Sequence, residues 1–484
     1  MKNKISQFFK NIKYCKELPE WIVLLVILGF SMFTMFYSDF QGTMDYAYQV
    51  TRQIFHGQFS GVPYMMANSY GMTLFTLLVI WMVPFCLFTI PFGEDFWYFG
   101  SLGAAIWSKM FLVVVTAFLV RGMVSLTKEL VAKENNKWVP LFFLTSAFYF
   151  VPVVQIGQCD IIALTFMIWG ILYYVRSDTR KFLVCFAFAI PMKYFALMIF
   201  IPLVLLKEKK PVKIIVQGIA GGSLFFVNLI IRKLVWGTVV GSFTSIAISN
   251  MSSTSNAVQE VEEGIQSGIV YVESNTIENF FGTFIANSSV FVITYILICI
   301  LAYAIKYDRD KNRDRIWAIY IPALVYSSFF VFTGINVYWT VLVAPFLTIL
   351  IFCNRESVYC RMGMLLETIA GWALMFVFIF KAAWVVGGEK TFEYLFLKGK
   401  TVGSDIHTFL EYENDFSGLL PYANSAYVAC MIALLILHMP WLINKQETEE
   451  NEQSFDRWII WLRIGILLIW VALLVYVLLL HGHD

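Results

Sequence analysis

Two carboxylates near the start of the chain have the chemistry of a general base. Asp39 and Asp45 stand in the polar segment 37–64, which follows the first long apolar run, and residues 44–56 have the periodicity of an amphipathic helix. A carboxylate at a membrane surface can accept the proton of a hydroxyl group as a new C–O bond forms. The alternative for each acid is a solvated surface residue without a chemical role.

Two further polar residues lie between apolar runs. Gln158 and Asp160 belong to the segment QIGQCDII, residues 155–162. A charged side chain that faces lipid costs about 3 kcal/mol, so we expect Asp160 to face water or protein beside a cavity. The alternative is a plain polar turn between two helices.

A lysine stands inside the next apolar region. Lys193 precedes Tyr194 and has apolar residues on both sides. Its compact ammonium group is suited to binding a phosphate, whose negative charge grows when it departs as a leaving group. The alternative is a structural lysine that is paired with a buried carboxylate.

An aromatic segment, GINVYWTVLVAPF, covers residues 334–346. Asn336, Tyr338 and Trp339 open a predicted helix at the outer interface. Aromatic residues at this depth commonly form the interfacial belt of a membrane protein. Because sugar rings also stack on aromatic faces, the same residues are suited to a sugar site.

The elements that must position these residues are predicted to be membrane helices. The chain has 484 residues, of which 59% are hydrophobic and 14% charged, and its mean hydropathy is +0.71. Uncharged runs of about 18–22 residues are long enough to cross about 30 Å of hydrocarbon, and they lack the alternation of a β-barrel strand. We therefore expect an all-α bundle of about 11–13 transmembrane helices, with spans near 21–37, 104–123, 138–154, 161–175, 214–231, 288–305, 316–333, 339–353, 363–385, 425–443 and 458–480.

The distribution of basic residues predicts the sidedness. Lysine and arginine gather before the first span and in the loops at 121–137, 176–181, 207–213 and 306–315, whereas the long segment 234–287 is acidic and has no basic residue. The positive-inside rule places the N-terminus and these loops in the cytoplasm. The apolar stretch 72–92 then should not cross. Residues 182–206 are too few for two crossings, so we expect a re-entrant pair of short helices with its tip at 192–194.

The chain divides into two predicted parts, both in the membrane. Residues 1–360 form a catalytic module with a first outer loop at 38–71, and residues 361–484 add helices with an outer loop at 386–424. The eight cysteines lack CxxC spacing and the five histidines form no ligand cluster. We therefore expect reduced thiols, no metal and no other cofactor, and nothing indicates a nucleic-acid partner.

Taken together, these segments resemble the GT-C superfamily of multi-pass glycosyltransferases, over about residues 20–355. Members similar to this chain carry an acid in the first outer loop, followed by a helix, a later glycine and a proline–tyrosine pair. They also carry a GQxD turn, an xKYF segment before a run that ends in prolines and a basic loop, and an aromatic segment before a proline–phenylalanine pair. The matching residues here are Asp45, Gly57, Pro63, Tyr64, Gly157, Gln158, Cys159, Asp160, Met192, Lys193, Tyr194, Phe195, Pro202, Tyr338, Trp339, Pro345 and Phe346. The chain departs from the family in a shorter acid-to-glycine distance, and the last third has no match.

The resemblance implies a cell-membrane enzyme of mannosyltransferase-like type with its active site facing outside. It would transfer a hexose from a polyprenyl-phosphate sugar to an extracytoplasmic glycan or lipid-linked acceptor, with inversion. Asp45 would be the base and Asp39 its substitute, and Lys193 would bind the phosphate. The other expected substrate-binding residues are Gln158, Asp160, Tyr194, Asn336, Tyr338 and Trp339. The metal-using members carry tandem acids, whereas Asp39 and Asp45 are six positions apart, so no metal is expected.

Two alternative functions remain open at this point. A polysaccharide polymerase or ligase would usually carry arginines on its outer loops, and those are scarce here. A glycolipid transporter without catalysis would show inverted repeats with broken helices at corresponding positions. The sequence indicates one break and no repeat.

Overall fold

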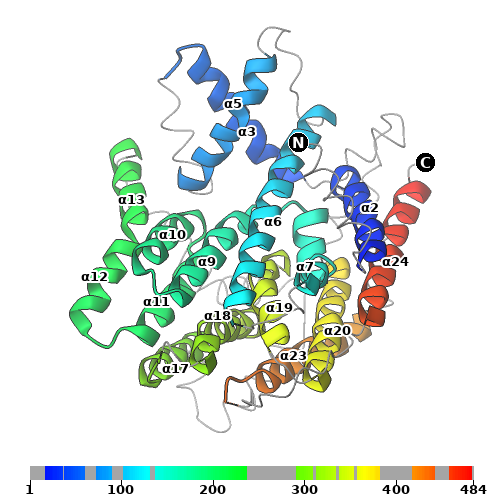
Figure 1. The fold of residues 1–484 in the computed structure, drawn as a ribbon. Helices are drawn as coiled ribbons and strands as arrows, with labels where there is room; N and C mark the ends of the chain where they lie inside the picture. The colour runs from blue at the N-terminus through cyan, green and yellow to red at the C-terminus, as the bar shows by residue number, and fades with distance from the viewer. Residues whose placement is uncertain are drawn as a thin grey trace, which may run out of the picture.

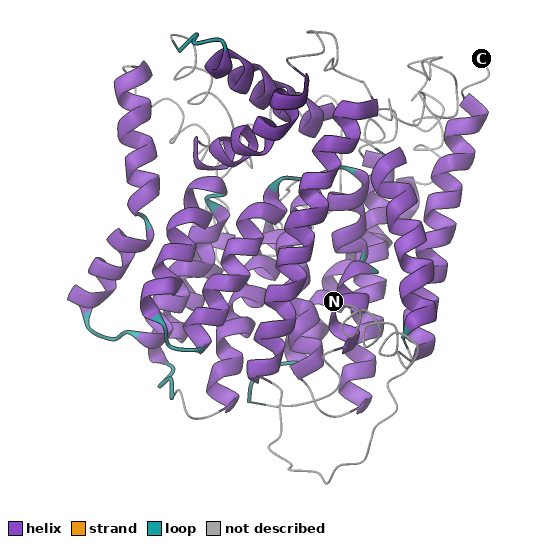
Figure 2. Ribbon diagram, turned by 45° about the horizontal axis from the view of Figure 1, so that its top comes forward, coloured by secondary structure: helices purple, strands orange, loops and turns teal. Residues whose placement is uncertain are grey.

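The structure is a computed structural model that describes residues 17–35, 38–59, 72–89, 102–130, 137–236, 290–308, 312–333, 337–353, 357–381, 417–441 and 457–481. Every regular element in these ranges is a helix (Figures 1 and 2), so the all-α expectation is confirmed for them. The first helices are α2 (Leu18–Thr34), α3 (Ser38–Phe55), α5 (Met72–Thr89) and α6 (Leu102–Leu130).

The middle of the chain is built from short helices joined by breaks. In order they are α7 (Trp138–Leu144), α8 (Ala147–Tyr149), the π-helix η4 (Phe150–Gln155), α9 (Asp160–Val175), α10 (Thr179–Met192), α11 (Phe195–Lys207), α12 (Pro211–Gly221) and α13 (Ser223–Trp236). The remaining elements are α17 (Val290–Ala304), α18 (Asn312–Phe332), the 3₁₀ helix η5 (Val337–Leu342), α19 (Ala344–Cys353), α20 (Ser357–Lys381), the 3₁₀ helix η7 (Ser417–Leu419), α23 (Leu420–Leu437) and α24 (Arg457–His481).

Fewer of these helices can span a bilayer than the sequence indicated. By length and composition four described helices qualify, or six if each of two bent pairs is one span; the pairs bend by 61° at 144–147 and by 51° at 221–223. Several expected spans are apolar helices of 10–17 residues, such as Ala344–Cys353. At about 1.5 Å per residue these fall short of the hydrocarbon thickness. The expected span at 339–353 contains part of the 3₁₀ helix η5 as well as α19, because hydropathy counts the apolar residues of a break together with the helix.

The outward faces of the helices are apolar. Large hydrophobic side chains are exposed along α12, α13, α17 and α24, among them Val212, Ile215, Ile230, Leu234, Ile296, Leu297, Leu468, Ile469 and Leu473. Exposed apolar surface on this scale is expected where lipid, not water, is the neighbour. The described chain is therefore compatible with an integral membrane protein.

Helices α3 and α5 pack on each other at one end of the bundle (Figure 1). The Tyr48 and Phe85 rings meet edge to face at 6.2 Å, and the Thr51 hydroxyl lies 3.3 Å from the Val79 carbonyl oxygen. Met72–Phe88 is one of the shorter apolar helices. Whether α5 crosses the bilayer stays a prediction.

The C-terminal helices join the same core as the rest. Helix α24 lies beside α2, and α20 lies beside α23 (Figure 1). At one end Arg457 pairs with the fully buried Glu20 of α2, at 2.6 Å. Buried side chains from α2 to α24 form a single hydrophobic cluster. The last third is therefore packed against the part of the chain that carries the candidate site.

Candidate functional site

The helix pair α10–α11 is broken at the lysine that the sequence singles out. Helix α10 ends at Met192 and α11 begins at Phe195. Lys193 has extended backbone angles, and its N–H donates to the Ala189 carbonyl at 3.0 Å. Pro191 lies in the last turn of α10. The break falls within the expected tip at 192–194, although whether the pair is re-entrant is untested.

Lys193 forms a buried ion pair with the first residue of α9. Its Nζ lies 2.9 Å from Oδ1 of Asp160, and the two side chains are only 13% and 8% exposed. The ammonium also lies 4.7 Å from the centre of the Trp339 ring and 5.1 Å from that of Phe195. Both rings add a cation–π attraction. The pairing with a buried carboxylate, one of the two alternatives for Lys193, is thus present in the structure.

The second oxygen of the same carboxylate is not satisfied. Oδ2 of Asp160 is buried, and no hydrogen-bond donor among the described residues reaches it. A buried acceptor without a donor costs about 1–3 kcal/mol, and more when it is charged. The N-terminal end of α9 offsets part of this cost, because the helix dipole favours negative charge there. The arrangement suits a ligand that brings an O–H or N–H group to Oδ2.

The turn before Asp160 has a defined backbone. Gly157 has a φ of +83°, a conformation that side-chain-bearing residues rarely adopt. The next N–H, of Gln158, donates to the Pro152 carbonyl at 2.9 Å, and the Gln158 side chain is half-buried. The Phe40 ring lies about 3.4 Å from the point where a Cβ of Gly157 would stand. The N-terminal end of α3, where Asp39 precedes Phe40, is therefore packed against this turn.

Aromatic residues of η5 and of the start of α11 lie around the ion pair. Tyr338 and Trp339 lie in η5, and Trp339 packs edge to face on Phe195 at 5.1 Å. Tyr194 meets Phe195 in the same way at 4.5 Å. The structure thus brings Asp160, Lys193 and Trp339 together, with Tyr194 and Tyr338 next to them. Asn336 lies outside the described residues.

Two contributors to this site were not expected from the sequence. Phe195 supplies a ring to Lys193, and its carbonyl accepts a hydrogen bond from the Tyr326 hydroxyl at 3.1 Å. Phe195 follows the KY pair directly, which is a signal that sequence reasoning could have used. Tyr326 is fully buried in the middle of helix α18. Its sequence neighbours are mostly apolar, so they do not indicate that it belongs to a site.

Asp45 lies in a different environment. It is half-buried on α3, and its Oδ2 accepts a hydrogen bond from the Gln49 amide at 2.7 Å. It lines an open polar pocket of about 580 Å³, whose described walls are Asp45, Tyr48, Gln49, Arg52, Gln53, His56 and Gln58. The pocket is formed by α3 and the residues just after it, whereas the Asp160–Lys193 pair lies at the start of α9 and at the α10–α11 break.

Among the described residues, no three His, Cys, Asp or Glu side chains gather in a way that could hold a metal ion. Independence of a metal stays a prediction about activity. Comparisons of the chain with protein-family models and with curated protein sequences found no match. The function is therefore argued from the geometry of the site.

Proposed function

We propose that this chain is a GT-C-type membrane glycosyltransferase that moves a hexose from a polyprenyl-phosphate sugar to an extracytoplasmic glycan or lipid-linked acceptor. One observation carries the proposal. The buried pair of Asp160 and Lys193 lies among aromatic rings, and one carboxylate oxygen of the pair has no donor from the described chain. A purely structural ion pair is expected to have its remaining lone pairs satisfied.

The two charged groups suit the two sides of a glycosyl-phosphate bond. The ammonium of Lys193 has three N–H donors, of which Asp160 takes one. In the proposed reaction another would donate to the phosphate as the C–O bond breaks and negative charge grows on the leaving oxygen. The free Oδ2 of Asp160 would accept a hydrogen bond from a hydroxyl of the sugar, and the rings of Trp339 and Tyr338 would border it.

The proposed transfer is a single displacement. The acceptor oxygen bonds to the anomeric carbon, the bond from that carbon to the phosphate oxygen breaks, and polyprenyl phosphate leaves. The hydroxyl proton passes to a carboxylate. Asp45 remains our proposed base, because its carboxylate lines an open polar pocket that can admit an acceptor. Asp39 is the substitute, and its place before Phe40 at the turn supports it.

A transporter is the second candidate, and the helix breaks favour it. Two bent pairs and the break at Lys193 are the kind of discontinuity that transporters use at their binding sites. A transporter would move the sugar lipid across the bilayer without making a glycosidic bond.

Two measurements, product analysis in nanodiscs and translocation in proteoliposomes, separate these functions. The purified chain in lipid nanodiscs is incubated with polyprenyl-phosphate mannose, glucose or galactose and an extract of cell-envelope lipids and glycans, and products are identified by mass spectrometry. The proposal expects one hexose to be transferred by the wild type and not by Asp160→Asn. Movement of the unaltered sugar lipid across proteoliposomes, with no new glycosidic product, would support the transporter. Addition of many repeat units to one acceptor would indicate a polymerase.

A further inference from the structure

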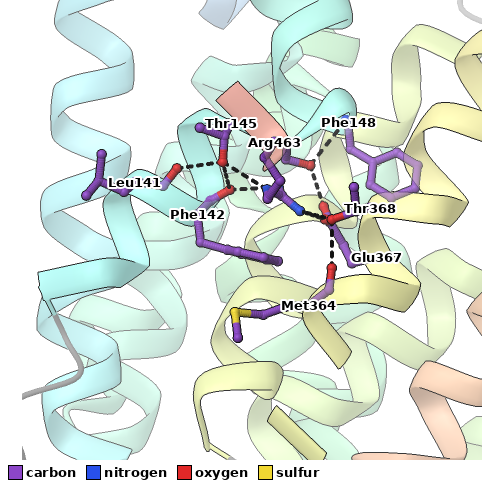
Figure 3. Close-up of polar contacts among 9 residues, drawn as sticks. Leu141, Phe142, Thr145, Phe148, Met364, Glu367, Thr368 and Arg463 are labelled. Carbon is purple, nitrogen blue, oxygen red and sulfur yellow. Dashed lines mark hydrogen bonds and ion pairs between the residues drawn. The ribbon is translucent and has the colours of Figure 1, made fainter. Parts of the chain in front are cut away.

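The C-terminal helix α24 contacts the segment from α7 to η4, which leads into the turn before Asp160. Figure 3 shows Arg463 of α24 inserted at the break between α7 and α8, where it forms an ion pair with Glu367 of α20. Both side chains are 1% exposed. The guanidinium donates to Thr145 Oγ1 at 2.9 Å and to the Phe142 carbonyl at 2.9 Å.

The buried cluster around Arg463 is well satisfied by hydrogen bonds. Nη1 also donates to Thr368 Oγ1 at 2.6 Å, and the Ser146 hydroxyl donates to the second oxygen of Glu367. The Phe142 ring lies 3.8 Å from the guanidinium carbon. A buried ion pair with such complete bonding fixes how neighbouring elements meet. This cluster therefore fixes α20 and α24 against the start of the α7–η4 segment.

Two helical turns further along α24, Trp470 reaches the end of the same segment. Its indole N–H donates to Oε1 of Gln155 at 3.1 Å. Gln155 is the last residue of η4 and is only 2% exposed. Trp470 lies seven positions after Arg463, which puts both on one face of the helix. The indole ring is itself packed on Trp372 of α20 at 5.3 Å.

The segment that Trp470 contacts is a π-helix, and the site turn follows it directly. The Ile156 N–H donates to the Val151 carbonyl at 2.9 Å across five residues. The Val154 carbonyl accepts a bond from the buried Lys109 of α6 at 2.6 Å. Short π-helical segments are rare and less regular than α-helices, and they often occur at functional sites. Their geometry therefore depends on side chains from neighbouring elements.

We propose that Trp470 is a positioning residue of the site: its hydrogen bond to Gln155 holds the end of η4, so that the turn through Gly157 brings Asp160 to Lys193. The effect of Trp470 on catalysis rests on the proposed glycosyl transfer. Its effect on the position of the turn does not depend on that function. In this role the C-terminal helices contribute the scaffold of the turn rather than a separate activity.

The test uses Cys159, which lies in the turn and is half-buried, as a local reporter. The full-length chain keeps Cys159 and carries alanine at its seven other cysteines, and the rate of alkylation by iodoacetamide is measured in nanodiscs. Trp470→Phe keeps an aromatic ring but removes the donor. We expect about a tenfold faster alkylation, because loss of the partner of a buried acceptor lowers the free energy of local opening. The matched control is Trp461→Phe, on the same helix but 41% exposed, which should leave the rate unchanged.

A double-mutant cycle identifies the bond itself. Gln155→Leu should raise the Cys159 rate by a similar factor, and the double variant should react no faster than either single variant, because both lose one bond. Trp470→Phe should also lower the transferase kcat while Trp461→Phe does not. An unchanged Cys159 rate in both Trp470→Phe and Gln155→Leu would overturn the inference, whether or not the chain transfers sugar. A faster rate in a chain that shows no transferase activity would support the inference and reject only the proposed function.

Discussion

The ammonium of Lys193, at the break between α10 and α11, lies 2.9 Å from Oδ1 of Asp160, the first residue of α9. Each charge makes the burial of the other tolerable, since an unpaired ion in this environment is strongly disfavoured. The pair thus joins two helix ends that hydropathy alone would treat as separate turns. It leaves one carboxylate oxygen and part of the ammonium group for a ligand.

Removing one partner of this pair should cost more stability than removing both. Lys193→Met leaves a buried carboxylate without its cation, a change that typically costs about 3–5 kcal/mol. Lys193→Met with Asp160→Asn should recover most of that loss, and Lys193→Arg should keep part of the activity because the charge persists. Thermal unfolding and transfer rates of the four proteins in nanodiscs measure this. Equal unfolding temperatures for Lys193→Met and the wild type would show that the pair contributes nothing to folding.

The Arg463–Glu367 cluster should behave as a structural element. Arg463→Met leaves Glu367 buried and unpaired, so the midpoint of thermal unfolding should fall sharply, and expression should fall with it. Arg463→Met combined with Glu367→Met, which removes both charges, should be closer to the wild type. The measurement is thermal unfolding in a fixed detergent. A double variant that is as unstable as the single one would mean that the contacts to Thr145 and Thr368, not the ion pair, hold the helices together.

Chelation should leave the activity intact. The proposed displacement uses Lys193 to stabilise the leaving phosphate, and the sequence offers neither adjacent acids in the segment 37–64 nor a histidine cluster. Transfer rates are compared before and after dialysis against EDTA, with added Mn²⁺ or Mg²⁺ as the control. Loss of activity on dialysis that either ion restores would show that Asp39 and Asp45 bind a cation instead.

The proposed orientation can be tested with two exposed positions. Lys210 lies in the basic loop after α11 and Gln58 lies just after α3, and both side chains are exposed. In sealed cells an impermeant maleimide should modify Gln58→Cys and should leave Lys210→Cys unmodified until the membrane is opened. The reverse pattern would place the Asp45 pocket in the cytoplasm. Labelling of both positions would place both outside the cell. The chain would then cross the membrane an even number of times between residues 58 and 210, whereas the proposed orientation requires an odd number.

The sequence predicts the local features of the candidate site better than its contacts. The polar turn at 157–160 and the break at Lys193 are visible because glycine, proline and charged residues interrupt apolar runs. Which carboxylate pairs with Lys193 is decided by how α9 meets the α10–α11 break, and no local pattern encodes that contact. The same holds for Trp470 and Gln155, which are far apart in the sequence.

The number of membrane spans is a feature that hydropathy predicts less well, because it does not reveal bends within an apolar run. Hydropathy indicates an apolar run at 138–154, and the structure has helices there, but with a 61° bend at Thr145 and Ser146. The Ser146 hydroxyl accepts the Phe148 N–H at 3.2 Å and so begins a new helix. Serine and threonine can bond the backbone in this way without lowering the hydropathy of the run very much. Within the described residues, an apolar run long enough to cross can therefore consist of two shorter helices.

The most direct test of the account is the turnover of Asp45→Asn. The amide keeps the size of the side chain and can still accept the hydrogen bond from Gln49, but it cannot take a proton. With a polyprenyl-phosphate hexose and the purified chain, the rate should fall by about 10²–10⁴, while Asp39→Asn at the same protein level should be milder. Abolition by Asp39→Asn with full turnover in Asp45→Asn would exchange the two roles. Full turnover in both variants would contradict the account, because no carboxylate of α3 would then accept the proton of the transfer.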